Sequence, residues 1–214
     1  RTILGALSIV ALLVVLATPF IAGAQFFVMF DRVMHTSFFT PETGGYALGY
    51  QHIFWFYSHP AVYIMILPGM GVISEVIACF SRKRVFGYPF VAMSSLGIAI
   101  IGFIVWGHHM YVTGQSSYAN IVFSILTYIV AVPSAIKVFN WLGTMWMGNI
   151  RFHVPMLHAI AFVSMFTIGG LSGIFMAATP VDIAIHDTYF IVAHIHYVLF
   201  MSSVFGIFAA IYFW

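Results

Sequence analysis

Five histidines lie inside apolar runs that are long enough to cross a lipid bilayer: His59, His108, His109, His194 and His196. An imidazole in hydrocarbon costs free energy unless something binds it, so several of them together indicate a bound metal ion or cofactor. The chain has one cysteine, Cys79, which excludes an internal disulfide and a thiolate metal cage. Any metal ion must therefore be held by imidazole nitrogen or by oxygen.

The spacing of the histidines limits how they can share a ligand. His194 and His196 are two residues apart, which turns the second by about 200° from the first on an α-helix. They point to opposite faces, so they cannot bind one metal ion but can serve two cofactors on either side of one helix. His108 and His109 are adjacent and diverge by about 100° on a regular helix. Both can reach one metal ion only if the helix is locally irregular or if the ion lies between their directions.

The composition is that of an integral membrane protein. Hydrophobic residues make up 63% of the 214 residues and charged residues 6%, far below the roughly 25% charged residues of a soluble domain. The net charge of +2 carries no nucleic-acid signal. A bilayer crossing needs about 20 residues, and six apolar segments exceed this length. We therefore predict a single all-α transmembrane domain over residues 1–214, with candidate membrane spans over roughly residues 3–30, 50–79, 88–111, 119–146, 155–178 and 189–214.

Charged residues in the connecting segments predict the orientation of the chain. Arg82, Lys83 and Arg84 occupy one loop, and Arg151 lies in another loop on the same side. On the opposite side Arg32 lies among acidic residues. By the positive-inside rule, the two basic loops face the cytoplasm or its equivalent. The sequence begins without an initiator methionine and is still apolar at its last residue, so we expect an internal part of a longer protein.

Three motifs contain the histidines, in this order: WFYSHPAVY over residues 55–63, WGHHM over residues 106–110 and HDTYFIVAHIHY over residues 186–197. Together they resemble subunit I of the haem-copper oxygen reductases, and the resemblance extends over nearly the whole chain. It implies six helices of a twelve-helix catalytic subunit. It also implies the family's reaction, the four-electron reduction of O2 to water, coupled to proton uptake from the inner side and outward pumping.

The resemblance assigns a copper ion to three of the histidines: His59, His108 and His109. In the family the first of these rings is covalently bonded to a tyrosine, here Tyr63, which can deliver an electron and a proton to bound oxygen. His59 and Tyr63 are four residues apart and so share a helix face. Three neutral imidazoles suit copper, and an open coordination position facing iron leaves room for O2.

Two haems and a hard cation are implied as well. His194 corresponds to the proximal ligand of a five-coordinate, high-spin haem. His196 corresponds to one of two ligands of a six-coordinate, low-spin haem, whose other ligand lies on a helix outside this chain. His186 and Asp187 correspond to residues near a magnesium or manganese ion. A carboxylate beside an imidazole can bind such a cation or hydrogen-bond the haem propionates.

Lys137 lies in the middle of a predicted span, where a lysine costs about 2.5 to 3.5 kcal/mol on insertion scales. It should therefore pair with water or polar groups inside the bundle; the alternative is a side chain that snorkels to the interface. Ser134 and Thr144 lie three and seven residues away on nearly the same face, and Thr127 extends this strip. Residues 133–139 resemble the family's lysine-dependent proton channel, which leads to the tyrosine at position 63.

Position 61 departs from the commonest family pattern. Many members have a glutamate there, which ends a second proton channel, whereas this chain has Ala61, which cannot relay a proton. Tyr57 lies four residues earlier on the same face, so its hydroxyl can reach the region that the carboxyl group would occupy, with Ser58 beside it. This arrangement resembles the type A oxidases that lack the glutamate. The alternative is that Tyr57 is an ordinary packing residue.

The electron donor and the partners follow from the resemblance alone. Cytochrome c is the expected donor, with quinol as the alternative. Expected partners are subunit II, with a dinuclear copper site, subunit III and the lipid bilayer, in a bacterial plasma membrane or, alternatively, the mitochondrial inner membrane. Two other functions compete: a nitric oxide reductase, against which Tyr63 argues, and a transporter or channel that relays protons without a cofactor. The latter would not need the opposed pair His194 and His196.

Overall fold

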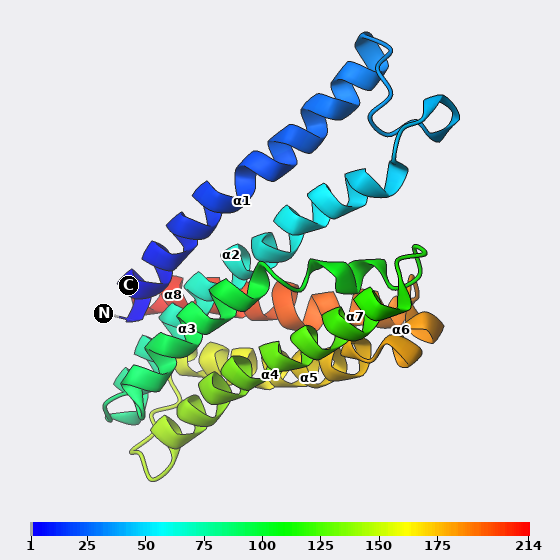
Figure 1. Cartoon of the computed structure of the whole chain (residues 1–214). Coiled ribbons are helices and arrows are strands. Elements are labelled where there is room, and N and C mark those ends of the chain that lie inside the picture. Colours follow the sequence, from blue (N-terminus) through cyan, green and yellow to red (C-terminus); the bar gives the residue numbers. More distant parts are fainter. Residues whose placement is uncertain (1) are drawn as a thin grey trace.

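The computed structural model describes residues 2–214, which form helices joined by short connections (Figure 1). In this part of the chain five helices are long and apolar enough to cross a membrane. Four are continuous: α1 (Thr2–Val33), α2 (Ala47–Ser81), α4 (Ser117–Met145) and α5 (Val154–Ala177). The fifth consists of α7 (Tyr189–Ile195), the π-helical turn η3 (His196–Met201) and α8 (Ser202–Phe213). Each matches a predicted span, so the all-α membrane fold is confirmed.

The predicted span over residues 88–111 is not one continuous α-helix. α3 (Tyr88–Gly102) has 15 residues, or about 22 Å of α-helix, which is shorter than the core of a bilayer. The backbone then leaves the α-helix and forms the 3-10 turn η2 (Trp106–Met110). Two close contacts flank the break: a Cβ atom on Gly102 would lie 2.7 Å from the ring of Tyr63, and one on Gly107 would lie 2.2 Å from the ring of Phe123. Packing against neighbouring rings accompanies the break, and hydrophobicity alone does not predict it.

Helix α2 is central to the arrangement. It pairs antiparallel with α1 and also contacts α3, α4, α5 and α8. One half of the α1–α2 pair projects beyond the other helices, whereas both ends of the chain lie at the other end of the molecule (Figure 1). Two further short helices, η1 (Pro41–Thr43) and α6 (Thr179–Ile185), belong to connections between the spans. The half of α2 that ends at the basic loop, residues 59–81, is therefore enclosed by the rest of the bundle; we call this end of the molecule the inner half.

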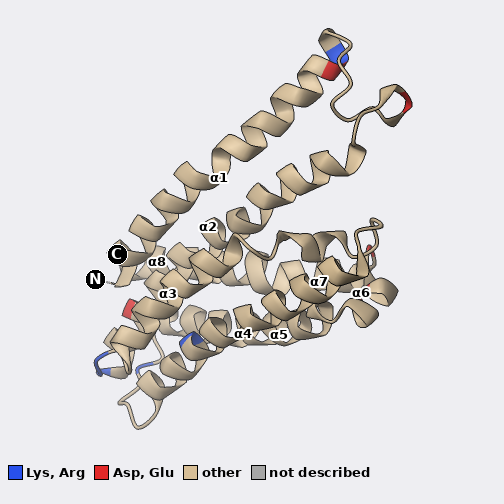
Figure 2. Cartoon of the chain, viewed as in Figure 1, with Lys and Arg blue, Asp and Glu red and all other residues tan. Residues whose placement is uncertain are grey.

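Most charged residues lie at the two ends of the molecule, whereas Lys137 on α4 is buried inside it (Figure 2). The basic loop after α2 and the loop between α4 and α5 lie together, because the amide of Arg151 donates to the carbonyl of Phe80 across 2.9 Å. The ammonium of Lys83 donates to the carbonyls of Gly143 and Trp146 and so caps the C-terminal end of α4. The predicted placement of these two basic loops on one side is thus confirmed.

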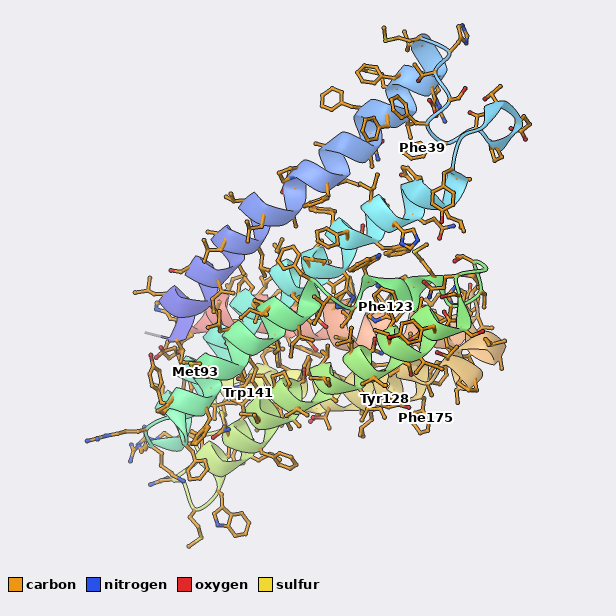
Figure 3. The ribbon with its side chains drawn as sticks, viewed as in Figure 1. Phe39, Met93, Phe123, Tyr128, Trp141 and Phe175 are labelled. Atoms are coloured by element: carbon orange, nitrogen blue, oxygen red, sulfur yellow. The ribbon has the colours of Figure 1, made fainter. Side chains whose placement is uncertain are left out.

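The core of the inner half is built around Trp141 on α4, which is fully buried between the helices (Figure 3). Its indole Nε1 donates to Oγ of Ser74 on α2 across 2.9 Å. The rings of Phe162 and Phe166 on α5 meet it edge-on, with centroids 5.7 and 6.2 Å away. One side chain therefore joins three helices through both apolar and polar contacts.

We expect Trp141→Ala to lower the free energy of unfolding by about 3–5 kcal/mol, the usual cost of truncating a large aromatic residue in a core. Trp141→Phe should cost less, because it keeps most of the ring contacts and loses one hydrogen bond, which contributes about 1 kcal/mol. The thermal midpoint of the purified protein in detergent is the measurement. Equal midpoints for the parent and Trp141→Ala would show that this contact does not hold the helices together.

Candidate functional site

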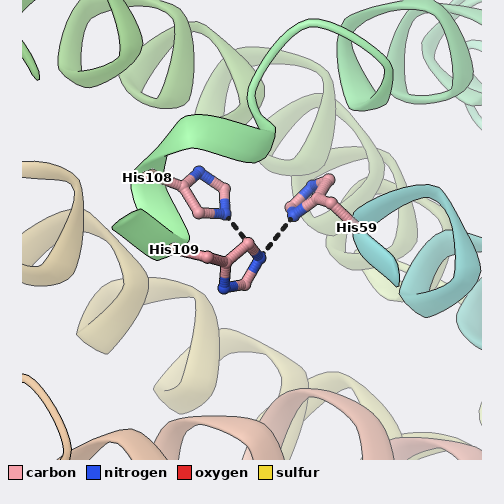
Figure 4. Close-up of side chains that lie close together, drawn as sticks. All are labelled: His59, His108 and His109. Carbon is pink, nitrogen blue, oxygen red and sulfur yellow. Dashed lines mark hydrogen bonds between the residues drawn. The ribbon is translucent and has the colours of Figure 1, made fainter. Parts of the chain in front are cut away.

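Three imidazoles converge at the middle of the structure (Figure 4). His59 comes from α2, and His108 and His109 come from η2. Nε2 of His109 lies 3.0 Å from Nε2 of His108 and 3.2 Å from Nδ1 of His59. Candidate ligand atoms of the three side chains lie within 4.8 Å of one another, close enough to hold one metal ion. Sequence positions 50 residues apart are therefore brought to a single point.

The break after α3 lets the adjacent pair take part in this cluster. Of the two conditions predicted for His108 and His109 to share a metal ion, the first is met, because residues 106–110 are a 3-10 turn rather than an α-helix. This turn contacts both α2 and α4. The ring of Trp55 on α2 stacks on the ring of His109, with centroids 4.0 Å apart and an angle of 9° between the planes.

Hydrogen bonds determine which nitrogen of His108 can bind a metal ion. Nδ1 of His108 is 2.8 Å from Oγ1 of Thr127 on α4. That hydroxyl already donates its proton to the carbonyl of Phe123, so it accepts the proton of the imidazole Nδ1. Nε2 of His108 therefore keeps its lone pair and faces the cluster, as in metal-binding histidines whose other nitrogen is held by the protein.

His59 has an unusual environment. Its Nε2 atom is buried and has no hydrogen-bond partner within the described residues, and an unpaired buried polar atom costs about 1–3 kcal/mol. The ring of Tyr63, one helical turn further along α2, lies beside it with centroids 4.7 Å apart. The Nδ1 atom faces His109. The two nitrogens of His59 are thus set for two different bonds, one toward the cluster and one away from it.

The rings of His194 and His196 are each fixed by a hydrogen bond from one ring nitrogen to a backbone carbonyl oxygen. Nδ1 of His194 is 2.8 Å from the carbonyl oxygen of Gly169 on α5, and Nδ1 of His196 is 2.7 Å from that of Val192 on its own helix. A carbonyl oxygen only accepts, so both Nδ1 atoms carry the proton and both Nε2 atoms keep a lone pair. The His194 ring lies so close to Gly173 that a Cβ atom there would be 2.9 Å from Cε1.

The two rings lie on different sides of the helix, as their spacing predicted. His194 contacts α5, whereas His196 is exposed and lies beside Phe200 with ring centroids 5.7 Å apart. His196 is also the first residue of the π-helical turn η3. Such turns are rare and occur often at functional sites.

His186 and Asp187 lie in the connection between α6 and α7. Nδ1 of His186 is 2.7 Å from Oδ2 of Asp182, whereas its Nε2 is 3.8 Å from Oδ1 of Asp187, whose side chain is 92% exposed. Asp182 is buried, and this burial raises the pKa of its carboxyl group, although the hydrogen bond with His186 opposes the shift. Asp182 was not among the predicted site residues, although its spacing of four residues from His186 could have suggested it. Within residues 2–214, only the three clustered histidines form a group of three or more candidate metal ligands.

Lys137 is buried inside the bundle, so it does not snorkel to the interface. Its Nζ atom donates to Oγ of Ser95 across 2.6 Å and to the carbonyl oxygen of Val91 across 3.2 Å, both on α3. The hydroxyl of Ser134, expected beside it, donates instead to the carbonyl oxygen of Val130 on its own helix. Likewise, the Thr144 hydroxyl donates within α4, to the carbonyl oxygen of Asn140. The side-chain partner of Lys137 is thus Ser95, which was not among the predicted residues.

Tyr57 and Ser58 lie on α2, directly before His59. Both are half-buried. Ala61 follows one turn after Tyr57 on the same continuous helix, which preserves the helical spacing on which their proposed relation depends.

Comparisons with known proteins agree with this geometry. The sequence profile of the family described as Cytochrome C and Quinol oxidase polypeptide I matches residues 2–214. Cytochrome c oxidase subunit 1 of Thermostichus vulcanus is 51% identical over 204 residues, which cover 95% of this chain and 37% of that protein. The proteins of the same name from Synechocystis sp. and Cereibacter sphaeroides are 52% and 47% identical, over 94% and 96% of this chain and 37% and 36% of their own lengths. The chain thus spans just over a third of the length of these curated relatives. It belongs to the cytochrome c and quinol oxidase polypeptide I family.

Proposed function

We propose that this chain is a ligand-bearing part of the catalytic subunit of a terminal respiratory oxidase, which reduces O2 to water at a haem-copper centre and couples the reaction to proton pumping. The observation that carries the proposal is the convergence of His59, His108 and His109 inside a membrane bundle. Bound copper and haem would supply electron transfer and O2 reduction, which side chains alone cannot perform.

Copper is the metal ion that the three-histidine cluster fits. Neutral imidazole nitrogens suit copper. Within residues 2–214 the cysteine is Cys79, which is exposed and is not part of the cluster. His108 is held in the required tautomer by Thr127. The unpaired Nε2 of His59 and the neighbouring ring of Tyr63 fit the covalent link that the family resemblance implies, with Tyr63 as donor of a proton and an electron.

The haem ligands are His194, for the high-spin haem, and His196, for the low-spin haem. Support comes from the fixed Nδ1 protons, which leave Nε2 free on each ring, and from the different directions in which the rings face. The role of this chain is to fix both rings on one helix, so that two cofactors are kept at a set spacing. Gly173 helps by allowing the His194 ring to lie against α5.

Protons would reach the centre along two routes. Lys137 and Ser134 on α4 form the first, which ends at Tyr63 and delivers protons from the inner side. The second route ends at Tyr57 and Ser58. They take the role of the glutamate that many family members have at position 61, where this chain has Ala61. The burial of Lys137 among hydroxyl and carbonyl groups supports the first route, because a lysine held inside a membrane bundle is typical of proton pathways.

The remaining parts of the proposal rest on the family. His186 and Asp187 would hold magnesium or manganese at the outer end, with Asp182 orienting His186. Cytochrome c is the proposed donor, in keeping with the names of the relatives, and subunits II and III are the proposed partners in a bacterial plasma membrane. The relatives named above are bacterial, which supports this location.

A proton transporter without a cofactor remains a distinct alternative. The orphan Nε2 of His59 and the three inward-facing imidazoles argue against it, because a transporter would need no such convergence. The optical spectrum of the purified protein decides between the two. Absence of haem bands would favour the transporter.

Replacing His108 or His109 by alanine should lower the copper content and abolish turnover while both haems stay bound, because neither residue contacts a proposed iron ligand. Elemental analysis gives the copper-to-iron ratio, and the haem spectrum serves as the control for folding. Full copper occupancy in both variants would mean that the cluster does not hold the metal ion.

His194→Ala should remove the haem that binds carbon monoxide and keep part of the low-spin signal, because His194 is the proposed protein ligand of the high-spin iron alone. His196→Ala should show the reverse pattern. Carbon monoxide difference spectra measure both. An unaltered spectrum in His194→Ala would remove the basis for this assignment.

Tyr57→Phe deletes one hydroxyl and keeps the ring, so it should slow proton-coupled turnover without changing the haem or copper spectra. Adding Ala61→Glu in the same background should restore part of the rate, since the two side chains share a helix face. Oxygen consumption and proton release by reconstituted enzyme are the measurements. If Tyr57→Phe turns over and pumps like the parent, Tyr57 is a packing residue.

A further inference from the structure

A cavity of about 110 Å³ lies beside Lys137, between helices α1, α2, α3 and α4. Its polar lining comes from all four helices: Thr2, Ser74, Tyr88, Ser95 and Lys137. A water molecule needs at least about 10–15 Å³ of such space and two to four polar partners. The cavity therefore has the size and the polar groups to hold several water molecules within the inner half of the bundle.

The ammonium of Lys137 is fixed at the wall of this cavity. Two of its hydrogen bonds go to α3, one to Oγ of Ser95 at 2.6 Å and one to the carbonyl oxygen of Val91 at 3.2 Å. An ammonium has three donors, so one remains for water in the cavity that Lys137 itself lines. The Ser95 hydroxyl donates its own proton to the carbonyl oxygen of Val91, across 3.2 Å. Ser95 therefore acts toward Lys137 only as an acceptor.

About two turns of α3 lie between the lysine contact at Ser95 and the contact of Gly102 with Tyr63, which adjoins the three-histidine cluster. The ring of Tyr63 packs against Gly102, at the far end of α3. Ser95 and Gly102 are seven residues apart, which corresponds to about 10 Å along the helix axis. While Lys137 is bound to Ser95, its ammonium is thus held toward the inner side and away from Tyr63. Proton transfer to Tyr63 requires either movement of the lysine or intervening water.

We infer that Ser95 is a positioning residue for proton uptake: by accepting a hydrogen bond from Lys137, it stabilises the charged lysine at the cavity, where the side chain takes up a proton. This inference rests on the proposed role of Lys137 in the proton route and names the group that sets its loading position. Without the hydroxyl, a charged lysine at this site loses its shortest hydrogen bond and is populated less often.

The neighbouring serine provides a matched control. Ser94 is also buried and also donates to the carbonyl oxygen of Val91, at 2.8 Å, but neither contacts Lys137 nor lines the cavity. Ser94→Ala and Ser95→Ala therefore remove the same group from adjacent positions of one helix. Only the second removes an acceptor from the lysine.

The test uses the complete oxidase with its cofactors and follows two reactions by stopped-flow spectroscopy. One is reduction of the oxidised, anaerobic enzyme, which loads protons through Lys137. The other is the reaction of the fully reduced enzyme with O2. Ser95→Ala should slow reduction of the high-spin haem by about tenfold, the typical effect of losing a hydrogen bond to a charged group. Its reaction with O2 should be unchanged.

Two further variants separate positioning from structure. Ser95→Thr keeps the hydroxyl and should reduce at a rate close to that of the parent. Ser95→Cys, which is similar in size but has a weakly hydrogen-bonding sulfur, should be slowed like Ser95→Ala and takes its place if the alanine variant does not assemble. Ser94→Ala should behave like the parent. Unaltered haem spectra confirm that each variant is folded.

The outcomes distinguish this inference from the proposed function. If Lys137→Met is reduced as fast as the parent, the lysine is not on a proton route and the proposed function loses that part. If Lys137→Met is slow but Ser95→Ala and Ser95→Cys are not, the route stands and the role of Ser95 is wrong. A slow Ser95→Ala enzyme that Ser95→Thr does not rescue would also overturn the inference, because the hydroxyl would not be the cause.

Discussion

Much of the site depends on one constraint: inside an apolar bundle, a ring nitrogen that does not serve a ligand needs a partner within the protein, as His108, His194 and His196 show. Three different acceptors meet this requirement. A side-chain hydroxyl holds His108, a carbonyl of the neighbouring helix α5 holds His194, and a carbonyl of its own helix holds His196. In each case the protonated nitrogen is Nδ1, so Nε2 carries the lone pair. The tautomers are thus fixed by backbone carbonyls and one hydroxyl of the helices themselves.

Much of this arrangement could be predicted from the sequence, because it depends on helical spacing alone. The pair His194 and His196 had to face different sides, and His59 had to share a face with Tyr63. Five of the six spans follow from length and hydropathy for the same reason. These properties belong to a single helix, and no neighbour is needed to establish them.

The parts that could not be predicted all involve contacts between helices. Helix α3 ends at Gly102, where the ring of Tyr63 on α2 packs against it, and the number of apolar residues in the segment does not predict this end. Lys137 pairs with polar groups inside the bundle, as expected, but its partners lie on α3 and not among the hydroxyls of its own helix. Ser134 satisfies its hydroxyl on the preceding turn of its own helix, but Ser95 does the same and still accepts from the lysine, so this local bond does not decide the partner. Which of several hydroxyls meets a buried charge is decided by helix packing.

Helix α4 runs beside the α3–η2 segment and is joined to it by two polar contacts, Lys137 with Ser95 and Thr127 with His108. The second contact starts from the 3-10 turn η2, which follows the break after Gly102. The turn that brings His108 and His109 to one cluster therefore also presents Nδ1 of His108 to the hydroxyl that fixes its tautomer. One helix, α4, thus contacts both the buried lysine's partner on α3 and the three-histidine cluster.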